Sequence, residues 1–117
     1  MQLLPDYVTQ GEARAAESLV RALIAAGYAI SVYDGMEMTV QHSLDVETVC
    51  RALATTDADR LYIAMRDSLS ATHVATIGSI LLVWGNASDG SELASDWSWD
   101  DRTQAGRDFN AFMDSRI

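Results

Sequence analysis

The segment that decides the fold is Gly27-Tyr28-Ala29-Ile30-Ser31-Val32-Tyr33-Asp34-Gly35. Its residues 28–33 alternate as in a β-strand, and Asp-Gly is a strong hairpin signal. A three-residue loop, 34–36, separates apolar from polar side chains better than a two-residue loop. This register pairs Val32 with Met38, Ile30 with Val40 and Tyr28 with His42. A hairpin at this point predicts an antiparallel sheet.

A helix precedes the hairpin. Thr9-Gln10-Gly11-Glu12 has the pattern of a capping box, in which the threonine hydroxyl and the glutamate carboxylate satisfy each other's backbone amides. The helix is expected to run to about Ala26, with Gly27 as its C-terminal cap. Its apolar stripe consists of Ala16, Leu19, Val20, Leu23 and Ile24.

The remaining elements follow the hairpin. We expect a helix at 46–55, strands at 60–66, 73–84 and 92–99, and a last helix at 103–115. The fold class is therefore α+β: an antiparallel sheet of four to five strands with two to three helices, in the order α-β-β-α-β-β-β-α. No linker or break in composition divides the chain, so residues 1–117 are expected to form a single domain.

The charge balance is strongly acidic. Seventeen acidic residues face eight basic ones, the formal net charge is −9, and all eight basic residues are arginine. Lysine-based catalysis is thereby excluded. Such a surface repels nucleic acid and anionic lipid and attracts basic partners, so we expect neither direct nucleic-acid binding nor membrane binding. For any single carboxylate, solubility alone is a sufficient explanation.

The chain has features of a cytoplasmic protein. A single cysteine, Cys50, forbids an internal disulfide and indicates a reducing compartment. The N-terminal residues 1–6 lack the basic and apolar regions of a signal peptide. The longest strongly apolar run, 80–84, is too short to cross a bilayer.

Patterns that carry catalysis, cofactors or metals are missing from the sequence. Neither phosphate-binding glycine loops nor a nucleophile elbow occur, and His42 and His73 have no metal-ligand spacing. Cys50 projects from the apolar stripe of a helix, which favours an inert core thiol. Asp57 and Asp59 are interpreted as turn formers. We therefore predict no catalytic residue, no cofactor and no metal, although a pair of carboxylates acting together is not excluded by spacing.

One stretch, Ser88 to Asp101, stands out because it holds five acids and two tryptophans but no basic residue. Tryptophan is enriched in binding hot spots, and a partly exposed tryptophan pair among carboxylates suits a basic, partly apolar partner. The competing interpretation is that both tryptophans are strand residues facing the core. The candidate partner-binding residues are Asp89, Glu92, Asp96, Trp97, Trp99, Asp100 and Asp101.

Three segments, 27–35 (GYAISVYDG), 43–59 and 78–86 (GSILLVWGN), together resemble small uncharacterised accessory proteins of bacteriophages, prophages and plasmids. The resemblance covers residues 17–98 in pieces and carries no catalytic residue. This chain departs from it in a longer connection at 67–75 and in the C-terminal helix. The resemblance implies a mobile-element accessory protein.

Three functions compete. The first is an inhibitor of anti-CRISPR or anti-restriction type: an acidic DNA mimic that binds the basic surface of a host nucleic-acid-handling defence complex. The alternative is a protein-interaction module that forms a homodimer through the exposed face of the sheet. A small enzyme that uses acidic residues ranks last, because no set of residues supports it.

Overall fold

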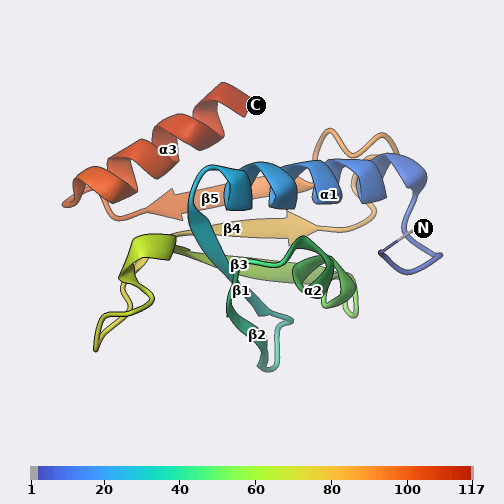
Figure 1. Cartoon of the computed structure of the whole chain (residues 1–117). Helices are drawn as coiled ribbons and strands as arrows, with labels where there is room; N and C mark the ends of the chain where they lie inside the picture. Colours follow the sequence, from blue (N-terminus) through green and yellow to red (C-terminus); the bar gives the residue numbers. More distant parts are fainter. Residues whose placement is uncertain (1–2, 117) are drawn as a thin grey trace.

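The computed structural model describes residues 3–116; Met1, Gln2 and Ile117, including the first two residues of the N-terminal segment discussed above, lie outside the described residues. Three α-helices and one five-stranded antiparallel sheet confirm the α+β class, with the strand number at the upper end of the expected range (Figure 1). The elements are α1 (Gln10–Ala25), β1 (Tyr28–Tyr33), β2 (Met38–Ser43), α2 (Val46–Arg51), β3 (Ala58–Met65), the 3-10 helix η1 (Arg66–Ser68), β4 (Thr76–Val83), β5 (Ala94–Trp99) and α3 (Gln104–Arg116).

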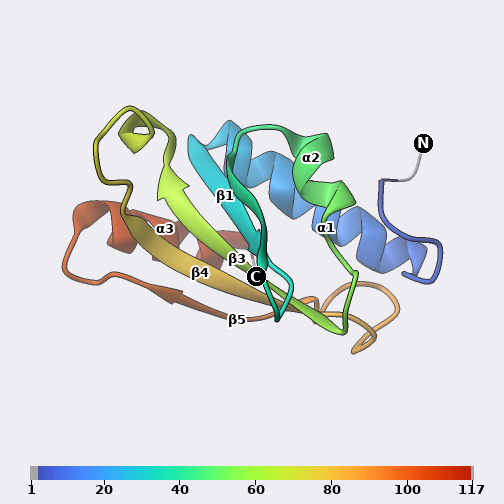
Figure 2. The same cartoon turned by 90° about the horizontal axis from the view of Figure 1, so that it is seen from below.

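The strands lie in the order β2-β1-β3-β4-β5, so β2 and β5 are the two edges of the sheet. Helices α1 and α3 run along one face of the sheet, and α2 packs beside α1 and contacts β1 and β2 (Figures 1 and 2). Side chains that point to this face are fully buried, namely Ile30, Val32, Leu61, Ile63, Ile80 and Leu82. We call the opposite face of the sheet the open face, because no helix within residues 3–116 covers it.

The two long helices form as their patterns predict. The Thr9–Glu12 capping box is present at the start of α1, and Gly27 follows the helix with a φ of 97°, which suits glycine. In α3, Phe109 and Met113 are buried. The ring of Phe109 lies directly on Gly78 of β4, where any Cβ would overlap the ring, so this glycine sets how closely α3 approaches the sheet.

The β1–β2 hairpin has a different register from the expected one. Val32 pairs with Val40 instead of Met38. The side chain of Asp34 explains the difference: its Oδ1 accepts a hydrogen bond from the backbone N–H of Glu37 at 2.9 Å, and the Asp34 N–H donates to the Glu37 carbonyl at 3.1 Å. Glu37 therefore belongs to the loop, which is longer than the three residues predicted.

His42 is also placed differently. It was expected on the apolar face opposite Tyr28, but β2 is irregular here: Ile30 pairs with Ser43, and His42 has a φ of 49°. The Oγ of Ser31 accepts a hydrogen bond from the His42 N–H at 3.0 Å and lies 3.4 Å from the ring Nδ1. The imidazole therefore lies on the open face, where it is half-buried.

Three expected elements are shorter than predicted: β5 begins at Ala94 instead of residue 92, and the other two are α2 and β4. Helix α2 ends at Arg51 instead of residue 55, because Ala54 adopts a φ of 61° and donates its N–H to the side chain of Asp59 at 2.7 Å. Strand β4 begins at Thr76 instead of His73, since η1 and its following turn occupy the connection from β3. The differences in α2 and β4 arise from local hydrogen bonding in connections, where hydrophobic periodicity gives no signal.

Candidate functional site

The acidic residues of the predicted site follow edge strand β5 along its length. Glu92 precedes the strand, Asp96 lies within it, and Asp100 and Asp101 come directly after it. Glu92, Asp96 and Asp101 are exposed. Because a strand rises by about 3.3 Å per residue, the backbones of Asp96 and Asp100 are about 13 Å apart. The structure thus arranges these acids in a row along one rim of the molecule.

The two tryptophans point to the face that α3 covers. Trp97 pairs with Ile80 and Trp99 with Gly78, whose neighbours on that face are core residues. Trp97 is half-buried, and its Nε1–H donates to Oδ1 of Asn110 in α3 at 3.0 Å. Trp99 is 41% exposed. Trp97 is therefore mainly a packing residue, whereas Trp99 offers apolar surface beside the acidic row.

Side chains alternate along β5, so the strand divides the candidate residues between the two faces of the sheet. Asp96 pairs with Leu81 and lies on the open face, and Trp97 and Trp99 lie on the other. Asp89 lies apart from the candidate residues on β5, because its loop packs against the start of α1. There Thr9 donates its hydroxyl to the Ser88 carbonyl at 2.7 Å. Asp96 and Trp99 thus lie on opposite faces of the β5 edge, Asp101 follows the strand, and Asp89 lies outside this stretch.

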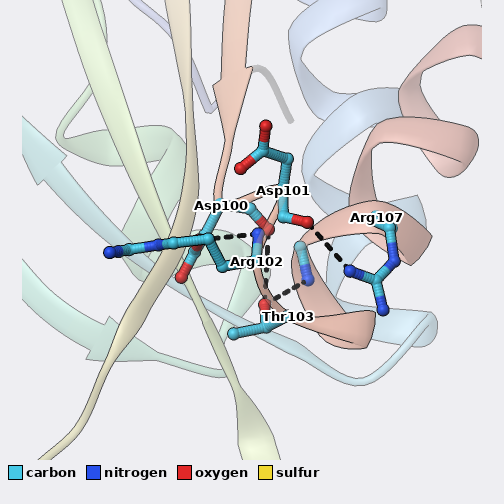
Figure 3. Close-up of polar contacts among 6 residues, drawn as sticks. Asp100, Asp101, Arg102, Thr103 and Arg107 are labelled. Atoms are coloured by element: carbon cyan, nitrogen blue, oxygen red, sulfur yellow. Dashed lines mark hydrogen bonds and ion pairs between the residues drawn. The ribbon is translucent and has the colours of Figure 1, made fainter.

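The carboxylate of Asp100 accepts hydrogen bonds from within the chain. Its Oδ1 accepts hydrogen bonds from both the backbone N–H and the Nε of Arg102, each at 3.1 Å (Figure 3). These bonds, the side-chain one first, lower the pKa of Asp100. The Asp100 side chain is only 24% exposed, against 87% for Arg102. Asp100 therefore shapes the turn between β5 and α3 more than it offers charge to a partner.

Among residues 3–116 the carboxylate of Asp101 accepts no such hydrogen bond, although it interacts electrostatically with Arg102. Arg107 donates from its guanidinium to the backbone carbonyl of Asp101 at 2.8 Å, and Figure 3 shows the Asp101 carboxylate directed away from both arginines. Thr103 fixes the start of α3, since its Oγ1 accepts a hydrogen bond from the Gly106 N–H at 3.0 Å. The backbone of Asp101 is thus held while its side chain remains exposed.

Ion pairs elsewhere do not neutralise the acidic row. The pairs found within residues 3–116 are Arg21–Glu17, Arg51–Glu47 and Arg102–Asp100. Glu92, Asp96 and Asp101 take part in none of them. Exposed carboxylates outside ion pairs contribute an electrostatic field that attracts cationic partners.

A second group of acids, for which the sequence analysis predicted roles only in a turn and a helix cap, is buried. Asp59 is only 1% exposed, and its Oδ2 accepts hydrogen bonds from the N–H of Ala54 at 2.7 Å and from Nε1–H of Trp84 at 2.8 Å. Its Oδ1 is buried and has no hydrogen-bond partner within residues 3–116, and burial raises the pKa of this carboxyl. Asp59 is thus a core residue and not a turn former; its position two residues before Leu61, on the same face of β3, was the available signal.

Glu12 is the other buried acid, with 3% exposure. Besides its capping-box role, its Oε2 accepts a hydrogen bond from the N–H of Gly85 at 2.6 Å. This contact ties the start of α1 to the turn that follows β4. Next to it lies a cavity of about 430 Å³ whose lining includes Tyr7, Thr9, Thr56 and Trp84.

Asp34 and Cys50 are two titratable groups outside the acidic row whose surroundings do not favour catalysis. Hydrogen bonds from the N–H groups of Glu37 and Met36 lower the pKa of Asp34, whereas a general acid needs a raised pKa. Burial raises the pKa of the fully buried Cys50 thiol to about 11, so it is unreactive at neutral pH. Across residues 3–116, no group of three or more histidine, cysteine or acidic side chains is placed to hold a metal ion.

Comparison of the chain with protein-family models, with curated proteins and with solved structures finds no match. Within residues 3–116, no helix combines the length and the apolar character that crossing a membrane requires.

Proposed function

We propose that this chain is a non-enzymatic binding protein whose acidic β5 edge contacts the basic surface of a nucleic-acid-handling protein. The observation that carries the proposal is the group Glu92, Asp96 and Asp101, which is exposed and takes part in none of the described ion pairs. Trp99 adds apolar surface at the same edge. Carboxylates in this setting accept charge-assisted hydrogen bonds from arginine and lysine in the way that phosphates do.

The class of partner follows from charge and from the resemblance. Because the chain has a formal charge of −9 and no lysine, we expect it to bind protein surfaces that normally hold phosphates. The segments at 27–35 and 78–86 resemble mobile-element accessory proteins, for which a host CRISPR or restriction complex is a natural target. We infer that the chain inhibits such a complex by occupying the place of nucleic acid, as a DNA mimic.

The test is competitive capture. The immobilised chain is incubated with bacterial host extract, and the bound proteins are challenged separately with salt and with a DNA or RNA oligonucleotide. We expect a nucleic-acid-handling protein that is released by both, because salt screens exposed charges and the oligonucleotide competes for the same cations. Retention in the presence of excess oligonucleotide would contradict mimicry.

A charge-matched pair of variants makes the test specific. Asp96→Asn/Asp101→Asn removes two carboxylates from the edge, and Glu37→Gln/Asp67→Asn removes two exposed carboxylates outside β5 and its flanking turns. Both variants change the net charge equally. Loss of capture by the first variant alone supports the site, and equal loss by both shows that net charge alone attracts the partner.

The open face of the sheet supports a second candidate function, a homo-oligomeric interaction module. No helix within residues 3–116 covers this face, and its hollow of about 350 Å³ is lined by Tyr33, Met38, His42 and Tyr62, among others. A dimer that buries these side chains would remain associated at high salt. Sedimentation velocity at low and high salt distinguishes the candidates, because a dimer that persists at high salt favours the module and a monomer favours the mimic.

A further inference from the structure

Strand β5 presents unused backbone hydrogen-bonding groups at the rim of the sheet. It is the last strand in the sheet order, and Figure 2 shows it as the outermost strand on its side. The Asp100 N–H donates to the Ile77 carbonyl at 2.9 Å, so these opposite residues form a bonded pair. Bonded and non-bonded pairs alternate in an antiparallel ladder, and the N–H and C=O groups of Trp97 and Trp99 therefore face outward.

The other edge strand, β2, is less suited to pairing with a further strand. Its pairing with β1 shifts register twice, His42 has a φ of 49°, and α2 contacts the strand. Irregularities of this kind prevent an edge from accepting another strand. In β5 the pairing with β4 is regular from Asp96 to Trp99, the part that carries the outward groups.

From these observations we propose that β5 binds an extended segment of its partner as a sixth strand, with arginine or lysine alternating with apolar residues. The inference rests on the proposed function and specifies how the partner is held. Backbone pairing at Trp97 and Trp99 supplies affinity, and the alternation of cationic and apolar side chains in the bound segment supplies specificity. Cationic side chains of the added strand lie on the open face beside Asp96, and its apolar side chains lie on the other face beside Trp99.

A second copy of the chain suits this edge less well than a basic segment. The antiparallel register that pairs Trp97 with Trp99 of the second copy, and so uses all the outward groups, also lays the acidic edge of one copy, with its exposed Asp96 and Asp101, against the same edge of the other. Like charges held close together across a pair of strands destabilise the pairing. Charge complementarity therefore selects a cationic strand as the occupant.

The test uses the full chain and three synthetic peptides. The first alternates arginine and valine, the second carries the same sequence with N-methyl groups on the amides that face β5, and the third has glutamate in place of arginine. N-methylation removes hydrogen-bond donors and leaves the charge unchanged. We expect the first peptide to bind, the second to bind at least about ten-fold more weakly, and the third not to bind.

Hydrogen exchange gives an independent readout at the edge. On binding of the arginine–valine peptide, the backbone amides of Trp97 and Trp99 should exchange more slowly, whereas those of β2 should not change. Equal, salt-sensitive binding of the first two peptides would refute strand addition while still supporting the acidic contact. If neither cationic peptide binds, or if both amides are already protected by self-association, strand addition is refuted; failure of oligonucleotide competition in the host extract separately refutes the proposed function.

Discussion

Two groups of tryptophan and acidic side chains lie near opposite ends of β4, and they differ in almost every physical respect. At one end, Trp84 bonds the buried carboxylate of Asp59. At the other, Trp99 pairs with Gly78 beside the exposed Asp96 and Asp101. The first group holds the fold together and the second leaves its charges available. This comparison shows that burial and hydrogen-bond partners, rather than residue type, determine which acidic side chains can bind a partner.

The largest effect is expected at Asp59. Asp59→Ala leaves the Ala54 N–H and the Trp84 Nε1–H without their acceptor, and it should lower the free energy of unfolding by about 2–4 kcal/mol. Urea unfolding followed by tryptophan fluorescence measures this. Asp59→Asn keeps an acceptor oxygen and serves as the control, so equal destabilisation by both variants would contradict the role of these two bonds.

The next effect is expected at Glu12, which joins α1 to the turn after β4. Glu12→Ala removes the bond from the Gly85 N–H and half of the capping box, and should cost about 1–2 kcal/mol. Glu17→Ala is the matched control in the same helix, because Glu17 forms an exposed pair with Arg21. Similar losses in both variants, measured by urea unfolding, would show that the contact with Gly85 contributes little.

The buried carboxyl also predicts a pH dependence. Burial raises the pKa of Asp59 above its value of about 3.9 in an unfolded chain, so the folded state holds this proton more tightly. The resulting stability is fully present below the unfolded pKa and is lost as the pH rises through the raised pKa. As the pH rises from about 3.9 through the raised pKa of Asp59, the wild type should therefore lose stability relative to Asp59→Asn. A stability difference that is independent of pH would contradict it.

At the β5 edge the expected effect on stability is the smallest. Asp96→Asn/Asp101→Asn alters exposed side chains that take part in none of the described ion pairs, and should change the free energy of unfolding by less than about 0.5 kcal/mol. Thermal unfolding measures this beside the capture experiment. Marked destabilisation would mean that these acids resemble Asp59 and would remove the contrast between the two groups.

Much of the fold follows from local patterns, and the exceptions have identifiable causes. The capping box at Thr9 and Glu12 and the apolar stripe predict α1 to within a residue at each end. The hairpin register could not be predicted, because it depends on which amides the Asp34 carboxylate accepts from. Asp59 was interpreted as a turn former because its neighbours suggested a turn, although its alternation with Leu61 placed it on the core face.

The candidate site was predictable only in part. Alternation alone puts Asp96 and Trp97 on opposite faces. That β5 is an edge strand depends on the order of the strands, which the local sequence does not encode. The difference between Asp100 and Asp101 depends on the turn into α3, where Arg102 bonds to one carboxylate and not the other.

The inaccessible thiol of Cys50 has a practical consequence for work on this edge. A Ser95→Cys variant, at an exposed position in β5, would carry the chain's only readily alkylated sulfur. A fluorophore attached there by maleimide chemistry would report on the outer strand alone, without first removing the native cysteine. Energy transfer from such a probe to a labelled partner would then show which rim of the molecule the partner approaches.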